Sequence, residues 1–307
     1  MSGRVNPVMA TWLLFITWSC SCGTTATTTM FDFGDADTAP GAPKTPAGGK
    51  DSGVIMLAPP SPVADCPVAA TLIYVTGEGS ALYSFDPETG TFTHIGILKC
   101  LDSPTHMTVD RQAVAWVVSD GKLYKASTAD ASCSAVSTWT PDAKNFSDFA
   151  LTFLGTTNAT DDALYLLGAS GELGNFNPTT GTLTDVGSVF LPRIHMNASG
   201  NTSDMTTNGD GTLYVTDDST PAQTLNQVDP TSASLLATYV TGENDSASDG
   251  ALAYYGGLFF DFVGKKVFTF DTQSMALTPL GTAPLQVTGA GQSTCVPTDA
   301  GPPAELR

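Results

Sequence analysis

The chain has 307 residues, of which 14% are charged, and it contains 30 Gly and 20 Pro. This composition favours short strands joined by tight turns over amphipathic helices, so we expect an all-β fold. The net charge of -18 repels a phosphate backbone, and we therefore expect no nucleic-acid partner. The same charge weakens contact with anionic lipid headgroups, so membrane attachment would require a lipid or another anchor.

Residues 1–22 have the features of a signal peptide. Arg4 precedes an apolar run from Val8 to Ile16, which is too short to span a bilayer but suits the core of such a peptide. The segment that ends in Cys22 resembles a bacterial lipoprotein signal, in which the cysteine at the cleavage site is lipidated. Ser19 departs from that signal, which usually has Leu there. We expect export, with a lipid on Cys22 or, alternatively, ordinary cleavage near it.

A tether and a folded region with four cysteines follow. Residues 23–65 are rich in Thr, Ala, Pro and Gly and cannot bury enough apolar surface to fold, so we expect a disordered tether. The remaining cysteines are Cys66, Cys100, Cys133 and Cys295. In an exported protein an even number indicates two disulfides, and three pairings are open. Metal binding is the rival interpretation, but no C-x-x-C pair supports it.

A pattern of strands repeats along the folded region. An aromatic residue marks one strand of each of five units: Tyr74, Trp116, Tyr165, Tyr214 and Phe259. An aspartate or a substitute ends the next strand at Asp86, Thr128, Asn177, Asp229 and Asp271. A repeat of about 40 to 50 residues built from short strands is typical of a propeller blade. The sequence therefore predicts a five-bladed β-propeller with four-stranded blades over residues 66–297, followed by a flexible tail over 298–307.

The innermost strand of each blade is expected before the marker aromatic. These strands are expected at 105–109, 146–151, 203–206 and 248–253. Residues 285–291 are similar to an inner strand, but no blade follows them, so we expect them to close the ring inside the first blade. Cys66 and Cys295 flank the resulting chain break, which predicts a disulfide between them and leaves Cys100 to pair with Cys133.

The cadence of the repeat resembles one group of proteins. Leu-Tyr strands, the Asp-Pro-x-Thr-Gly turn at 86–90 and the terminal Ser-Thr-Cys at 293–295 look like uncharacterised secreted bacterial β-propeller lipoproteins. The resemblance covers about residues 66–297. It implies a fold and no known activity.

Alignment of the inner strands gives a candidate central-channel site. Its members are His106, Asp148, Asp204, Asp249 and Thr288. Carboxylates gathered in a channel could bind Ca²⁺ or divide acid and base roles in the hydrolysis of a sugar or lactone. The interpretation we favour is structural: an Asp at the start of a strand accepts hydrogen bonds from local backbone N–H groups. No nucleophile elbow, H-E-x-x-H string or phosphate loop is present.

These features favour a binding module over an enzyme. We expect an exported, monomeric propeller that binds a protein or glycan, with any contact to the cell-envelope membrane made through an N-terminal lipid. A hydrolase that uses the channel carboxylates is the alternative; we expect no cofactor, and Ca²⁺ is the one candidate that this alternative leaves open. We assign no metal site from the sequence.

Overall fold

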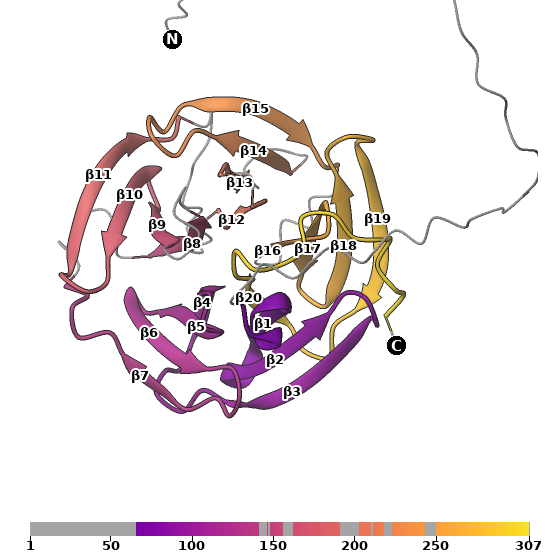
Figure 1. Cartoon of the computed structure of the whole chain (residues 1–307), viewed down its shortest axis with the longest axis horizontal. Coiled ribbons are helices and arrows are strands. Elements are labelled where there is room, and N and C mark those ends of the chain that lie inside the picture. Colours follow the sequence, from indigo (N-terminus) through magenta and orange to yellow (C-terminus); the bar gives the residue numbers. More distant parts are fainter. Residues whose placement is uncertain are drawn as a thin grey trace, which may run out of the picture. The chain divides into compact units, whose positions relative to one another are not determined.

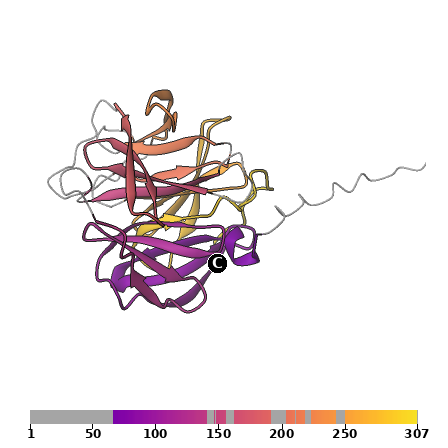
Figure 2. The same cartoon turned by 60° about the vertical axis from the view of Figure 1, so that its left-hand side comes forward.

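A computed structural model describes residues 66–140, 146, 148–155, 162–190, 203–209, 211–217, 223–242 and 250–306. These residues form five antiparallel sheets of four strands each, arranged as blades around a common axis (Figure 1). The protein is therefore an all-β, five-bladed β-propeller, as the repeat predicts. Figure 2 shows the blades obliquely, with the 3₁₀ turn η1 (Val68–Thr71) projecting from the ring.

The strands follow one another outward from the axis in every blade. Blade 1 consists of β20 (Val287–Gly291), β1 (Ile73–Gly77), β2 (Ala81–Asp86) and β3 (Thr91–Ile97). Blade 2 consists of β4 (Pro104–Val109), β5 (Val114–Ser119), β6 (Lys122–Ser127) and β7 (Cys133–Ala135). Blade 3 consists of β8 (Phe149–Gly155), β9 (Asp162–Gly168), β10 (Glu172–Asn177) and β11 (Thr182–Ser188). Blade 4 consists of β12 (Met205–Thr207), β13 (Leu213–Asp217), β14 (Thr224–Val228) and β15 (Leu235–Val240). Blade 5 consists of β16 (Gly250–Tyr255), β17 (Leu258–Val263), β18 (Lys266–Asp271) and β19 (Ala276–Thr282).

Aromatic side chains fill the spaces between adjacent blades. Phe85 of blade 1 meets Phe260 and Phe262 of blade 5 edge to face, with ring centroids 5.8 and 6.2 Å apart. Between blades 4 and 5, the rings of Tyr214 and Phe259 lie 4.5 Å apart. Because successive residues of a strand point to opposite faces, an aromatic repeated once per blade produces a hydrophobic layer at each blade boundary.

The C-terminal strand closes the ring. In blade 1, β20 pairs antiparallel with β1, with Gly291 opposite Tyr74. A Cβ on Gly291 would meet the carbonyl oxygen of Met107 and lie 2.6 Å from the Cα of Thr108, so glycine is what lets β20 approach blade 2 this closely. The predicted closing strand is confirmed in residues Val287–Gly291.

Both predicted disulfides are present. Cys66 is joined to Cys295 across 229 residues, beside the chain break in blade 1. Cys100 is joined to Cys133 across 33 residues within the region of blades 1 and 2. Structural disulfides persist in oxidising compartments, so the pair indicates folding outside the cytoplasm.

Several segments differ from the expected boundaries: β12 covers Met205–Thr207 where 203–206 was expected, and β16 covers Gly250–Tyr255 where 248–253 was expected. The inner strand expected at 146–151 begins at Phe149, because the carboxylate of Asp148 accepts the N–H of Phe149 and caps the strand start. Residues 298–306, expected as a flexible tail, lie against the last and first blades: Ala304 N donates to Pro87 O at 3.0 Å, and Leu306 N donates to Leu280 O at 3.4 Å.

The signal peptide with Cys22, the tether at 23–65 and Asp249 lie outside the described residues. In the parts of the chain that the structure describes, no helix is long and apolar enough to span a bilayer.

Candidate functional site

The candidate site lies where the five inner strands approach the axis. Each of β4, β8, β12, β16 and β20 is the edge strand of its sheet on the side that faces the axis. An edge strand carries backbone N–H and C=O groups without a ladder partner, and burial makes such groups costly unless something else binds them. Polar side chains on the inner strands are therefore expected to bond to the neighbouring inner strands.

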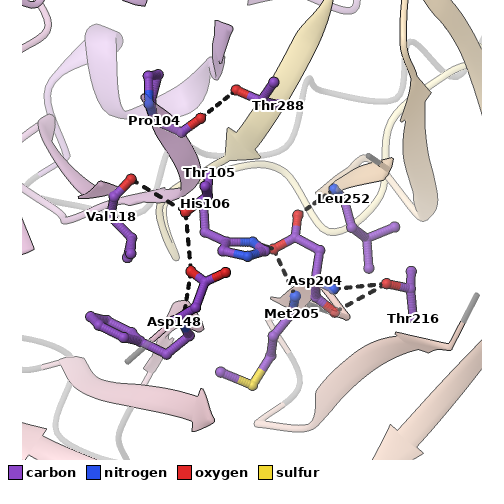
Figure 3. A network of polar contacts seen from close by, with 11 residues as sticks. Pro104, Thr105, His106, Val118, Asp148, Asp204, Met205, Thr216, Leu252 and Thr288 are labelled. Atoms are coloured by element: carbon purple, nitrogen blue, oxygen red, sulfur yellow. Dashed lines mark hydrogen bonds and ion pairs between the residues drawn. The ribbon is translucent and has the colours of Figure 1, made fainter. Parts of the chain in front are cut away.

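Asp204 is the centre of this arrangement and is 1% exposed. Its Oδ1 accepts the N–H of Met205 at 2.9 Å, and its Oδ2 accepts the N–H of Leu252 in blade 5 at 2.6 Å. The Nδ1 of His106, from blade 2, lies 3.1 Å from Oδ1 (Figure 3). His106 is itself 4% exposed. One carboxylate thus links blades 2, 4 and 5.

Asp148 and Thr288 lie beside this pair but bond to other groups. Asp148 Oδ1 accepts the N–H of Phe149 at 3.1 Å and the hydroxyl of Thr105 at 3.4 Å. Thr288 donates its hydroxyl to the carbonyl oxygen of Pro104 at 2.6 Å. Of the predicted site residues, the structure brings His106 and Asp204 into direct contact, and it connects Asp148 and Thr288 to the residues just before His106 (Figure 3).

Gln292 forms a second level of contacts that the sequence analysis missed. Its Oε1 accepts the N–H of Tyr254 at 3.1 Å, and its Nε2 donates to Thr206 Oγ1 at 2.7 Å and to Thr207 O at 3.1 Å. Gln292 is 2% exposed. The sequence contains a signal for Thr206, which stands two residues after Asp204 and hence points to the same side of the chain, but none for Gln292, which lies beyond the closing strand.

These contacts resemble a structural clamp more than a reaction centre. Both oxygens of Asp204 accept backbone N–H groups, whereas Ca²⁺ requires six to eight oxygen ligands, roughly. Among the described residues there is no group of three His, Cys, Asp or Glu side chains that could hold a metal ion. Asp249 lies outside those residues, so the structure does not test the alternative of Ca²⁺ binding at this level.

A second group of acidic residues lies in the turns between the third and fourth strands. Asp229 Oδ1 accepts the N–H and the hydroxyl of Thr231, both at 2.7 Å, and these bonds hold the pKa of Asp229 below its ordinary value. The hydroxyl of Ser274, together with the N–H of Gln273, lowers the pKa of Asp271 in the same way. In blade 3 the neutral Asn177 performs this role and accepts the N–H of Thr179 at 2.9 Å.

Blade 2 departs from this turn pattern. Its aligned residue, Thr128, donates its hydroxyl to Ala113 O at 2.6 Å. Asp130, two positions later, accepts the hydroxyl of Ser132 at 2.7 Å. The repeated acid of the sequence thus orders a turn and leaves a partly exposed carboxylate at the surface of most blades.

Comparisons with known proteins identify no family and no curated relative, since no protein-family model and no curated protein matches the chain. A solved structure titled "Crystal structure of Nidogen/Laminin Complex" is similar with 13% identity and a TM-score of 0.43, over 73% of this chain and 85% of that chain. We draw no conclusion about ligand or activity from this similarity.

Proposed function

We propose that the protein is an exported binding or scaffold propeller that presents its surface to a protein or glycan in the bacterial cell envelope. The observation that supports this most is the burial of the axial polar residues. His106 and Asp204 are 4% and 1% exposed, and their bonds hold the blades to one another. A ring so fixed offers rigid outer faces and turns to a partner, which reduces the entropy lost on binding.

Attachment through a lipid on Cys22 is part of the proposal. The apolar run that ends before Cys22, the tether and the resemblance to secreted bacterial lipoproteins support it. A Cys22→Ser variant should leave the membrane fraction for the soluble fraction and lose the mass of the acyl chains, whereas Cys20→Ser should keep both. Retention of the lipid mass in the Cys22→Ser variant would contradict this assignment.

The alternative, a hydrolase acting on a sugar or lactone, has less support. Asp204 would have to exchange its bonds to Met205 and Leu252 for contacts with a substrate, and removing a buried N–H from its acceptor costs about 1–3 kcal/mol.

The binding proposal is tested with the full exported chain on a glycan array and against purified envelope proteins. We expect saturable binding to one ligand class, unchanged by EDTA. The hydrolase would replace the binding module as the favoured function under two conditions. Binding would have to be absent in both assays, and the chain would have to turn over a sugar or lactone with an activity that disappears in an Asp204→Asn, Asp249→Asn double variant. A thermal melt in the presence of Ca²⁺ or of EDTA tests for a bound cation, because a cation bound only by the folded state raises the melting temperature.

A further inference from the structure

The C-terminal segment, residues 298–306, occupies a groove between the last and first blades. The groove is lined by Pro87 and Glu88 of blade 1 and by Tyr255, Leu258 and Phe260 of blade 5. Gly301 and Pro303 of the segment line its open side, and the enclosed space of about 10 Å³ is close to the minimum for one water molecule. Figure 1 shows this end of the chain, marked C, beside β19 and the end of β3.

Three residues of the segment, spaced three apart, face the body of the ring. Ala300 and Leu306 pack against the hydrophobic core of blades 1 and 5, and Pro303 lines the groove between them. A Cβ on Gly256 would lie 2.5 Å from that of Ala300, and a Cβ on Gly281 would lie 2.8 Å from that of Leu306. Between the anchors, Pro302 and Glu305 are exposed, Gly301 is exposed at the edge of the groove, and Ala304 is half-buried. A period of three is that of the polyproline II helix.

The backbone contacts fit a proline-containing peptide. Pro303 has no N–H to satisfy, and the next residue, Ala304, donates its N–H to Pro87 O at 3.0 Å. The floor is aromatic and acidic: Tyr255 donates its hydroxyl to Glu88 Oε1 at 2.9 Å. Burial, and then the bond to Glu88, raise the pKa of Tyr255 still further above physiological pH, where a tyrosine hydroxyl is a donor in any case. Aromatic grooves of this kind bind extended proline-rich segments in other proteins.

We propose that this groove is a recognition site for extended peptides of the pattern small-x-x-Pro-x-x-aliphatic, and that residues 300–306 are its built-in occupant. A segment of a partner protein with the same pattern displaces them. Displacement is feasible because no disulfide ties the segment beyond Cys295, and its anchors are only half-buried. This inference rests on the proposed binding function and names the class of partner.

The test uses the full chain with its own segment released by a Pro303→Asp, Leu306→Asp double variant. A fluorescent peptide with the sequence 299–307 should bind this variant at least ten-fold more tightly than it binds the unchanged chain. A peptide carrying the same two substitutions should bind neither. Absence of binding to a double variant that still melts cooperatively would overturn the proposal.

A pair of glycines provides a matched control. Gly90 has φ +66°, and a Cβ there would meet the carbonyl oxygen of Glu305. Gly79 has nearly the same φ, +71°, with no atom within 4 Å of the added Cβ. Gly90→Ala, added to the double variant, should weaken peptide binding at least ten-fold, whereas Gly79→Ala should not. Equal binding by the two would show that the peptide lies elsewhere.

If the double variant fails to fold, amide exchange in the unchanged chain gives the same information. Excess peptide should accelerate exchange at Ala304 and Leu306, because it releases the segment. Unchanged exchange at saturating peptide would refute displacement. Neither negative result touches the glycan and envelope-protein assays above, so failure of this inference is distinguishable from failure of the binding function.

Discussion

Replacing Asp204 by alanine removes the carboxylate that links blades 2, 4 and 5. Leu252 N–H and Met205 N–H then lose their acceptor in a region where Asp204 is 1% exposed, and His106 loses its contact with the Asp204 carboxylate. A buried donor left without an acceptor costs about 1–3 kcal/mol. With three donors affected and partial relief by an entering water, we expect a loss of about 3–6 kcal/mol in the free energy of unfolding, out of roughly 5–15 for a typical domain.

Urea unfolding followed by tryptophan fluorescence measures this loss. Asp148→Ala is the matched control, because the carboxylate of Asp148 is only partly buried and water can take its place as the acceptor of Phe149 N–H. This variant should lose less than about 1.5 kcal/mol in the free energy of unfolding. If Asp204→Ala costs no more than Asp148→Ala, the structural interpretation of the axial network is refuted.

Three further results follow from the ring. By the loop-entropy model, a Cys66→Ser, Cys295→Ser double variant should lose about 5 kcal/mol in the free energy of unfolding. Removing the Cys100–Cys133 disulfide should cost less, because its loop spans 33 residues instead of 229. Equal losses of the two variants in urea unfolding would contradict closure of the ring by the Cys66–Cys295 bond. Gly291→Ala should lower the free energy of unfolding by about 1–3 kcal/mol, because the added Cβ would collide with blade 2. Gly155→Ala should leave it nearly unchanged, because the added Cβ would meet nothing closer than 4.0 Å. Similar losses in the two variants would argue against the close approach of β20 to blade 2. The lowered pKa of Asp229 means that its turn contributes stability above about pH 4 and loses it as the pH falls further. Asp229→Asn, which copies the asparagine of blade 3, should therefore keep the fold at pH 7 and reduce the drop in melting temperature between pH 5 and 3; an unchanged drop would contradict this.

The architecture was largely predictable because it repeats. One aromatic residue per unit packs at a blade boundary, as the rings of Tyr214 and Phe259 show. Because every blade needs this contact at the same place, the aromatic residues recur at a regular spacing along the sequence. The closing strand and the Cys66–Cys295 disulfide were predictable for a related reason: a strand left over at the C-terminus can pair only with the blade that lacks one.

The details of the site were less predictable. Alignment of the inner strands identified the level of His106 and Asp204, but it could not show that Asp204 accepts an N–H from a different blade, since that depends on how the blades twist against each other. Gln292 was missed because it follows the last strand of the repeat and has no counterpart in the alignment. The C-terminal segment was expected to be a flexible tail because it follows the last strand of the repeat, whereas Pro303 lines the groove between blades 1 and 5.

Amide exchange at Leu252 tests most directly whether the axis of the ring is a sealed clamp. Its N–H donates to Asp204 Oδ2 at 2.6 Å, outside the regular strand ladder. The account predicts that this amide, with that of Tyr254, exchanges as slowly as the most protected amides of the core and loses its protection in Asp204→Ala. Exchange of Leu252 within minutes in the unchanged chain would show a channel open to water and would return the axial carboxylates to consideration as a reaction centre.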